Sequence, residues 1–236
     1  MLDIAGNDMA WILKRPTRGT DALVVNELIG MEAVSIDLSD EDDHAFGYRP
    51  YPLGAFGAML DVAVEEWNKD HEGHIRPRFL EVGCGPGTKL VLADEVFHLL
   101  AYGFDVSPKY VQAASELVGA RDDTAAIWTQ DVRAFDKWHV YDIIFLNRPL
   151  RDYQDELRLE LEVFGQMEVG SILILGNGLS TPDGWVKLAT GVAAAVYKKV
   201  CKCHGVEDVL KIDVIVAEAT HYVLTCKICD RSLTIS

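Results

Sequence analysis

The chain has 236 residues, 49% of them hydrophobic. This length is enough for one α/β domain with a sizeable core but short for two domains. Acidic residues outnumber basic ones by 37 to 22, and the resulting formal charge of -15 argues against duplex nucleic acid as a partner. No apolar run approaches the roughly 20 residues of a membrane span. The N-terminus lacks the basic start followed by an apolar stretch that is typical of a secretory signal. We therefore expect a soluble, cytoplasmic protein with reduced cysteines.

The first part of the chain is the least regular. Residues 1–53 are predicted to form an N-terminal segment, either a lid or a cap on the substrate side, ahead of a domain over 54–236. A short helix is expected within 21–31. Tyr48, Arg49 and Tyr51 lie among turn-forming residues, which suggests a segment that closes over a ligand or packs on a sheet edge. The apolar spacing over 55–68 then predicts an amphipathic helix.

Apolar strands and helices alternate through the middle of the chain. This alternation predicts a parallel sheet covered on both faces, and hence an α/β fold with a Rossmann-like doubly wound sheet of about seven strands. The expected strands are 79–82, 102–106, 125–129, 141–146 and 171–175, and the expected helices are 88–100, 107–118 and 152–167.

The last part of the chain changes character. A helix is expected over 185–200, and the basic clusters Lys14, Arg15, Arg18 and Lys198, Lys199, Lys202 are interpreted as solvated surface. Two β-rich runs, 210–217 and 221–228, are joined by a short turn and predict a hairpin.

A glycine-rich turn follows the first strand of the alternating region. Residues 79–88 read F-L-E-V-G-C-G-P-G-T, so glycines stand at Gly83, Gly85 and Gly87. Such a turn lets backbone approach a ligand, and the helix that follows directs its N–H groups to the same place. Asp105 ends the next strand, 22 residues after Gly83, where a carboxylate accepts hydrogen bonds from ribose hydroxyls. The pattern predicts a nucleoside site.

The glycine spacing distinguishes between nucleoside ligands. The dinucleotide fingerprint is G-x-G-x-x-G, and Thr88 stands where its third glycine belongs. The pattern E-V-G-C-G-P-G-T, followed by Asp105, resembles motif I and the acidic second-strand loop of class I S-adenosylmethionine-dependent methyltransferases. The resemblance runs from about Phe79 to Leu175, and the hairpin at 210–228 resembles the family's sixth and antiparallel seventh strands.

The resemblance implies S-adenosyl-L-methionine as cofactor and methyl transfer as activity. Glu81 and Gly83 would line the methionine end, Asp105 the ribose, Val106 the adenine and Asp131 the adenine amino group. Glu81 is alternatively a buried structural acid, and Asp131 a loop acid or helix cap. The implied donor-binding set is Glu81, Gly83, Cys84, Gly85, Gly87, Asp105, Val106, Asp131, Val132 and Asn147, although Cys84 also suits a plain turn position.

The acceptor is less defined than the donor. Asn147-Arg148-Pro149-Leu150 occupies the motif IV position, where enzymes that methylate base amino groups resemble one another in N-P-P-aromatic. The aromatic platform for a flipped base is absent. Arg148 either meets an anionic substrate or pairs with Asp152 or Asp155. No catalytic residue is identified, because an activated donor mainly needs a positioned nucleophile.

These residues favour a small molecule or a protein side chain as acceptor. A nucleic-acid methyltransferase, a non-catalytic S-adenosylmethionine-binding regulatory subunit and a nicotinamide-dependent oxidoreductase are the alternatives. Nothing in the sequence indicates an oligomeric state.

Two cysteine clusters lie near the C-terminus, Cys201-Lys202-Cys203-His204 and the pair Cys226 and Cys229. Soft ligands in two such clusters could hold zinc tetrahedrally. The first cluster has an unusual spacing, and reduced thiols in a β core are commoner, so no metal site is predicted.

Overall fold

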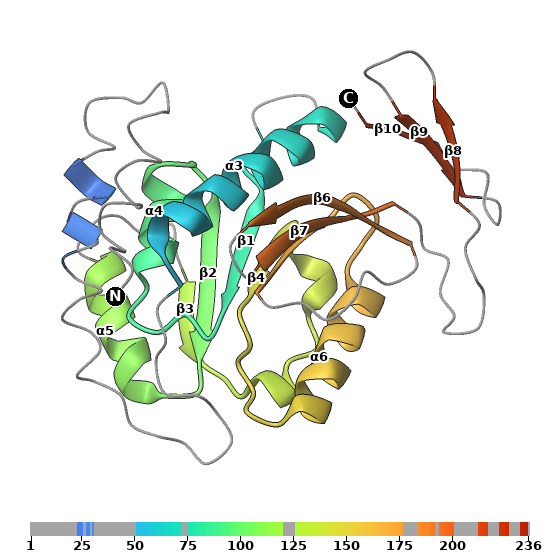
Figure 1. Ribbon diagram of the computed structural model, residues 1–236. Coiled ribbons are helices and arrows are strands. Elements are labelled where there is room, and N and C mark those ends of the chain that lie inside the picture. Colours follow the sequence, from blue (N-terminus) through green and yellow to red (C-terminus); the bar gives the residue numbers. More distant parts are fainter. Residues whose placement is uncertain are drawn as a thin grey trace, which may run out of the picture.

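A seven-stranded sheet with helices on both faces dominates the molecule (Figure 1). The computed structural model describes residues 51–71, 75–119, 126–176, 184–191 and 194–200. It also describes helical positions between 23 and 30 and the backbone of three further strands at 212–216, 222–226 and 232–235. The helical positions agree with the short helix predicted within 21–31.

The sheet has the strand order β3-β2-β1-β4-β5-β7-β6. β1 to β5 pair in parallel, whereas β7 runs antiparallel to both β5 and β6. This arrangement confirms the predicted Rossmann-like doubly wound sheet with a final antiparallel strand. The strands are β1 Arg78–Val82, β2 Leu100–Asp105, β3 Ala126–Thr129, β4 Ile143–Leu146, β5 Ile172–Gly176, β6 Trp185–Gly191 and β7 Ala194–Lys199.

The helices divide between the two faces of the sheet. The α3, α4 and α5 helices share one buried cluster with the sheet, which includes Phe56, Phe79 and Phe145. The α6 helix and the 3-10 turn η3 share the other cluster, which includes Trp138, Phe164 and Tyr197. The bounds are α3 Leu53–Asp70, α4 Thr88–Glu95, α5 Pro108–Gly119, η2 Val132–Ala134, η3 Trp138–Val140 and α6 Tyr153–Gln166.

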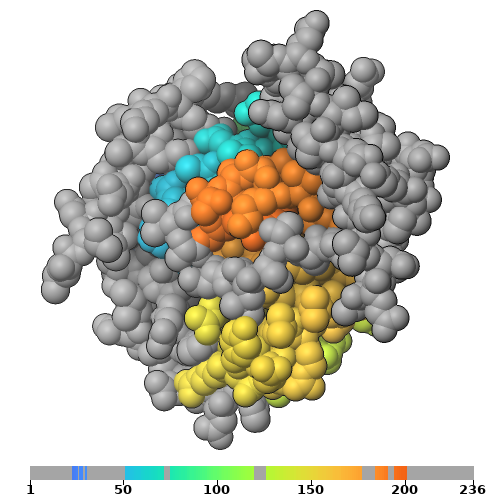
Figure 2. All heavy atoms as spheres, turned by 45° about the vertical axis from the view of Figure 1, so that its right-hand side comes forward, coloured from blue at the N-terminus to red at the C-terminus, as the bar shows by residue number. Residues whose placement is uncertain are grey.

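The helix predicted over 185–200 is wrong, because this segment forms β6 and β7. Residues 194–199 of β7 are all buried, since β7 lies inside the sheet between β5 and β6 and is covered on both faces. The sequence of such a strand lacks the alternation of polar and apolar residues, so an alanine-containing apolar run of this kind cannot be told from a buried helix by its pattern. Figure 2 shows the orange surface of β6 and β7 between the blue-to-cyan surface of α3 and the yellow surface of α6.

The hairpin predicted over 210–228 is confirmed, but its assignment to the sixth and seventh strands of the main sheet is wrong. β8 (Ile212–Val216) and β9 (Tyr222–Cys226) pair antiparallel, and β10 (Ser232–Ile235) pairs with β9. These strands form a separate three-stranded sheet. The main sheet is already complete at Lys199.

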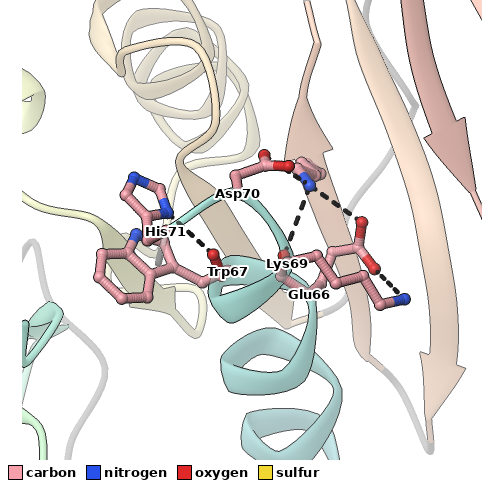
Figure 3. A network of polar contacts seen from close by, with 6 residues as sticks. Glu66, Trp67, Lys69, Asp70 and His71 are labelled. Carbon is pink, nitrogen blue, oxygen red and sulfur yellow. Dashed lines mark hydrogen bonds and ion pairs between the residues drawn. The ribbon is translucent and has the colours of Figure 1, made fainter. Parts of the chain in front are cut away.

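The interpretation of Lys198 and Lys199 as solvated surface is wrong, because both side chains are buried. The Lys198 ammonium lies 2.9 Å from Glu66 Oε1 and 2.9 Å from Asp70 Oδ2 on α3. Figure 3 shows this network at the end of α3, where His71 also stacks on Trp67. The Lys199 ammonium donates on the other face to the carbonyls of Phe164, Gly165 and Met167 at the end of α6.

Candidate functional site

The glycine turn lies at the carboxyl edge of the sheet, directly after β1. Gly83, Gly85 and Gly87 have φ values of 69°, 52° and 82°, a region that glycine enters without strain. The amides of Gly83 and Cys84 both donate to the Phe104 carbonyl at 2.9 Å, so the turn folds back over the end of β2. Gly83 is exposed, whereas the rest of the turn is buried.

Asp105 is held against this turn. Its Oδ2 accepts a hydrogen bond from the Gly85 amide at 3.0 Å, and its Oδ1 accepts one from the Ser107 amide at 2.9 Å. Burial raises the pKa of the Asp105 carboxyl, while the amides of Ser107, Gly85 and Val106 oppose the increase. The structure therefore brings together the two features that the sequence separates by some 20 residues, the glycine turn and the acid.

Three residues of the predicted set, in the turn or directly before it, have packing roles. Glu81 is buried in β1, level with Gly103 of β2 and Phe145 of β4. The Cys84 side chain lies in the core beneath the turn, and burial raises the pKa of its thiol well above the usual value, so it is an unreactive thiol. A Cβ on Gly87 would lie 2.9 Å from the Ala114 Cβ, so this glycine allows α4 and α5 to approach closely.

The predicted adenine side follows β2 and β3. Asp131 caps η2, and its carboxylate accepts from the Arg133 amide and guanidinium, with Nη2 to Oδ2 at 2.5 Å. Val132 is buried in the cluster that contains Phe104, and Val106 is half-buried at the end of β2. Asp131 thus is a helix cap, the alternative to an adenine contact, and the cap places its carboxylate at the edge where β3 ends.

Asn147 directly follows β4 and lies beside Gly176, the last residue of β5. A Cβ on Gly176 would collide with the Asn147 side chain and lie 3.1 Å from its Cα. Gly176 was missed by sequence reasoning, because no local pattern shows that a side chain of a neighbouring strand passes over it. Its position at the end of an apolar strand, ahead of another glycine at 178, was the available signal.

The turn after Asn147 has an unusual backbone. Arg148 has a φ of 47°, one of two positive values among non-glycine residues of the described chain. Of the two acids predicted as ion-pair partners of Arg148, Asp152 caps α6 by accepting from the Gln154 and Asp155 amides, and Asp155 pairs with Arg158. The charge of Arg148 also lowers the pKa of buried Glu156.

The predicted lid is described only in part. Tyr48 and Arg49 lie outside the described residues. Tyr51 is buried, with its ring 5.7 Å from that of Phe145, and burial raises its pKa to about 12. Tyr51 therefore packs on the sheet, as in the alternative interpretation.

No three metal-binding side chains of the described residues lie together. Cys201, Cys203, His204 and Cys229 lie outside the described residues, as does the Cys226 side chain. Within the described chain, every helix is too short or too polar to cross a membrane.

Comparisons with known proteins agree with this architecture. No family model matches the chain, and no curated protein matches it. Among solved structures, the chain is similar to an RNA methyltransferase from Salinibacter ruber in complex with S-adenosyl-L-homocysteine. The two are 18% identical with a TM-score of 0.50, over 68% of this chain and 98% of that chain.

Two further similarities are looser. TehB from Haemophilus influenzae is 14% identical with a TM-score of 0.45, over 61% of this chain and 62% of its own. PH0226 from Pyrococcus horikoshii OT3 is 13% identical with a TM-score of 0.44, over 61% of this chain and 91% of its own. The sheet order and the first of these similarities show that the chain has the class I methyltransferase fold.

Proposed function

We propose that this chain is an S-adenosylmethionine-dependent methyltransferase that acts on a small molecule or a protein side chain. The observation that carries the proposal is the contact between Asp105 and the Gly85 amide. It joins a glycine turn of the G-x-G-x-G type to an acid suited to ribose hydroxyls, within a sheet of the methyltransferase order. Because one fold hosts many functions, the proposed methyl transfer rests on the residues of the site and not on the fold alone.

The donor is proposed to lie along the carboxyl edge. Glu81 and Gly83 would meet its methionine end, Asp105 its ribose, and Val106, Asp131 and Val132 its adenine. Asn147 would face the reactive methyl group. The exposed Gly83 gives this edge a point of approach without a Cβ atom.

Methyl transfer from a sulfonium is an in-line displacement. A nucleophilic atom of the acceptor forms a bond to the methyl carbon as the carbon–sulfur bond breaks, and the electron pair of that bond stays on sulfur. The protein then needs to align the acceptor and exclude water, and a base is required only for an acceptor that is protonated at neutral pH.

Two features support an acceptor other than a nucleic-acid base. The formal charge of -15 disfavours a polyanion. Leu150, which stands where base-methylating enzymes have an aromatic residue, is buried in the core, so it offers no surface for stacking. The similarity to an RNA methyltransferase keeps RNA as the alternative acceptor.

Calorimetry with S-adenosylhomocysteine tests the donor site. Asp105→Ala should weaken binding at least tenfold, because the ribose hydroxyls lose a buried acceptor, a contribution of about 1.5–3 kcal/mol. Glu95→Ala is the matched control, since Glu95 is exposed at the far end of α4 and should leave affinity unchanged. Saturable binding of NAD without any response to S-adenosylhomocysteine would exclude the proposal.

Transfer of a radiolabelled methyl group from S-adenosylmethionine to cell extract would identify the acceptor class. Extracts treated with protease, with ribonuclease or by removal of small molecules separate the three candidates. Label that is lost only after ribonuclease treatment would favour the RNA alternative. Donor binding with no transfer to any fraction would favour the regulatory subunit.

A further inference from the structure

Glu156 is a buried acid beneath the turn that follows β4. It lies in the first part of α6 and is only 2% exposed. Its Oε2 accepts a hydrogen bond from the Leu150 amide at 3.0 Å. Glu156 therefore connects α6 to the last residue of the segment Asn147–Leu150, which we call the β4 turn.

The β4 turn needs such a connection. Arg148 adopts a left-handed backbone conformation, which costs a residue with a Cβ on the order of 1 kcal/mol or more and persists only where the surroundings hold it. One end of the turn is fixed by Asn147 against Gly176, and the other by the buried Leu150 side chain and the Glu156 contact. The turn thus presents Arg148 at the carboxyl edge, where that residue is exposed.

Burying the Glu156 carboxyl for this connection costs desolvation free energy. The Glu156 Oε1 is buried without a hydrogen-bond partner among the described residues. Burial raises the pKa of Glu156 to about 7, buried Glu160 one helical turn further on raises it as well, and the Leu150 amide and Arg148 lower it. Glutamine would accept the same hydrogen bond without a buried charge, so packing alone does not explain an acid here.

We propose that Glu156 is a positioning residue for the acceptor side of the site, whose carboxylate fixes the β4 turn through the Leu150 amide and orients Arg148 through its charge. This inference rests on the proposed function, because only a methyltransferase has an acceptor side at this edge. The charged groups that act on the pKa of Glu156 are Glu160 on α6, which raises it, and Arg148 on the turn, which lowers it.

Hydrogen exchange of the β4 turn tests the connection in the full chain. Glu156→Ala should raise exchange of the Leu150 amide at least tenfold, because its acceptor is lost, while Glu156→Gln should keep it within about threefold of the unsubstituted protein. The Gln variant thereby separates loss of the hydrogen bond from loss of the charge. Equal exchange in all three proteins would overturn the positioning role.

The charge has its own readouts. Protection of the Leu150 amide relative to the amides of β4, corrected for intrinsic exchange, should increase in the unsubstituted protein as the pH rises from 6 to 8, because the Leu150 hydrogen bond lowers the Glu156 pKa and is therefore stronger to the ionised form. It should stay constant in Glu156→Gln. With the acceptor found by methyl transfer, Glu156→Gln should lower kcat at least tenfold and leave the KM for S-adenosylmethionine within twofold. A Gln variant that matches the unsubstituted protein in both readouts would remove the charge from the proposal.

Binding of S-adenosylhomocysteine distinguishes this inference from the proposed function. All Glu156 variants should bind it within threefold of the unsubstituted protein, because the proposed donor contacts come from other residues. If the unsubstituted protein does not bind it, the proposed function fails, and the exchange data still decide whether Glu156 fixes the turn.

Discussion

Gly176 shows how one missing side chain shapes the carboxyl edge. A methyl group at this position would displace the Asn147 side chain and press on its backbone. Gly176→Ala should therefore lower the free energy of unfolding by about 1–3 kcal/mol and weaken S-adenosylhomocysteine binding, as denaturation and calorimetry would measure. Gly165→Ala is the control, because a Cβ there meets nothing within 4 Å, and it should leave binding unchanged and stabilise α6 slightly. Normal binding by Gly176→Ala would contradict the role given to this contact.

The ionisation of Glu156 makes the free energy of unfolding depend on pH. Its pKa is raised from 4.5 to about 7, so the folded chain holds the proton more tightly than the unfolded chain. Stability is then lost as the pH rises from the unfolded to the folded pKa, by about 3 kcal/mol in total. Glu156→Gln lacks this loss, so its advantage in free energy of unfolding should grow between about pH 4.5 and 7 and level off above that range. Parallel pH profiles of the two proteins would contradict the raised pKa.

At the scale of elements, Lys199 of β7 takes the place of a C-terminal cap for α6. Its ammonium donates to three carbonyls at the end of that helix, at distances of 2.5–3.0 Å. Lys199→Met should cost about 2–4 kcal/mol, because charged hydrogen bonds to a helix C-terminus are lost while the aliphatic packing stays. Lys187→Met on β6 is the control, since Lys187 is exposed and should cost under about 1 kcal/mol. Equal midpoints of chemical denaturation for the two variants would refute the capping role.

The elements also show what the sequence alone could predict. The glycine turn and Asp105 were predictable because each depends on local residue chemistry, a positive φ or a carboxylate after a strand. β7 was not, because its register beside β5 comes from distant residues, and burial on both faces removes the strand pattern. The prediction for Lys198 and Lys199 was wrong for a similar reason. A pair of lysines indicates exposed side chains unless their partners, here on α3 and α6, are known.

At the scale of the whole molecule, these two lysines fasten a helix to each face of the sheet. Lys198 pairs with Glu66 and Asp70 of α3, and Lys199 caps α6 on the opposite face. Because Lys198 binds α3 and Lys199 binds the end of α6 on the opposite face, the losses in unfolding free energy from Lys198→Met and Lys199→Met should add to within about 0.5 kcal/mol in the double variant. A larger discrepancy in denaturation would mean that the two faces are coupled through β7.

The position of β7 has a consequence for the order in which the chain can be completed. The strand inserts between β5 and β6, and its Lys198 meets Glu66, which precedes it by 132 residues. During synthesis α3 and the five parallel strands leave the ribosome first, with Glu66 still lacking this counter-ion and the outer edge of β5 open to other strands. Release of the chain beyond Lys199 lets β7 cover that edge and adds Lys198 to the ion pair that Glu66 makes with Lys69. Until β7 is released, the β5 edge of the nascent sheet therefore lacks the partner strand that covers it in the folded chain.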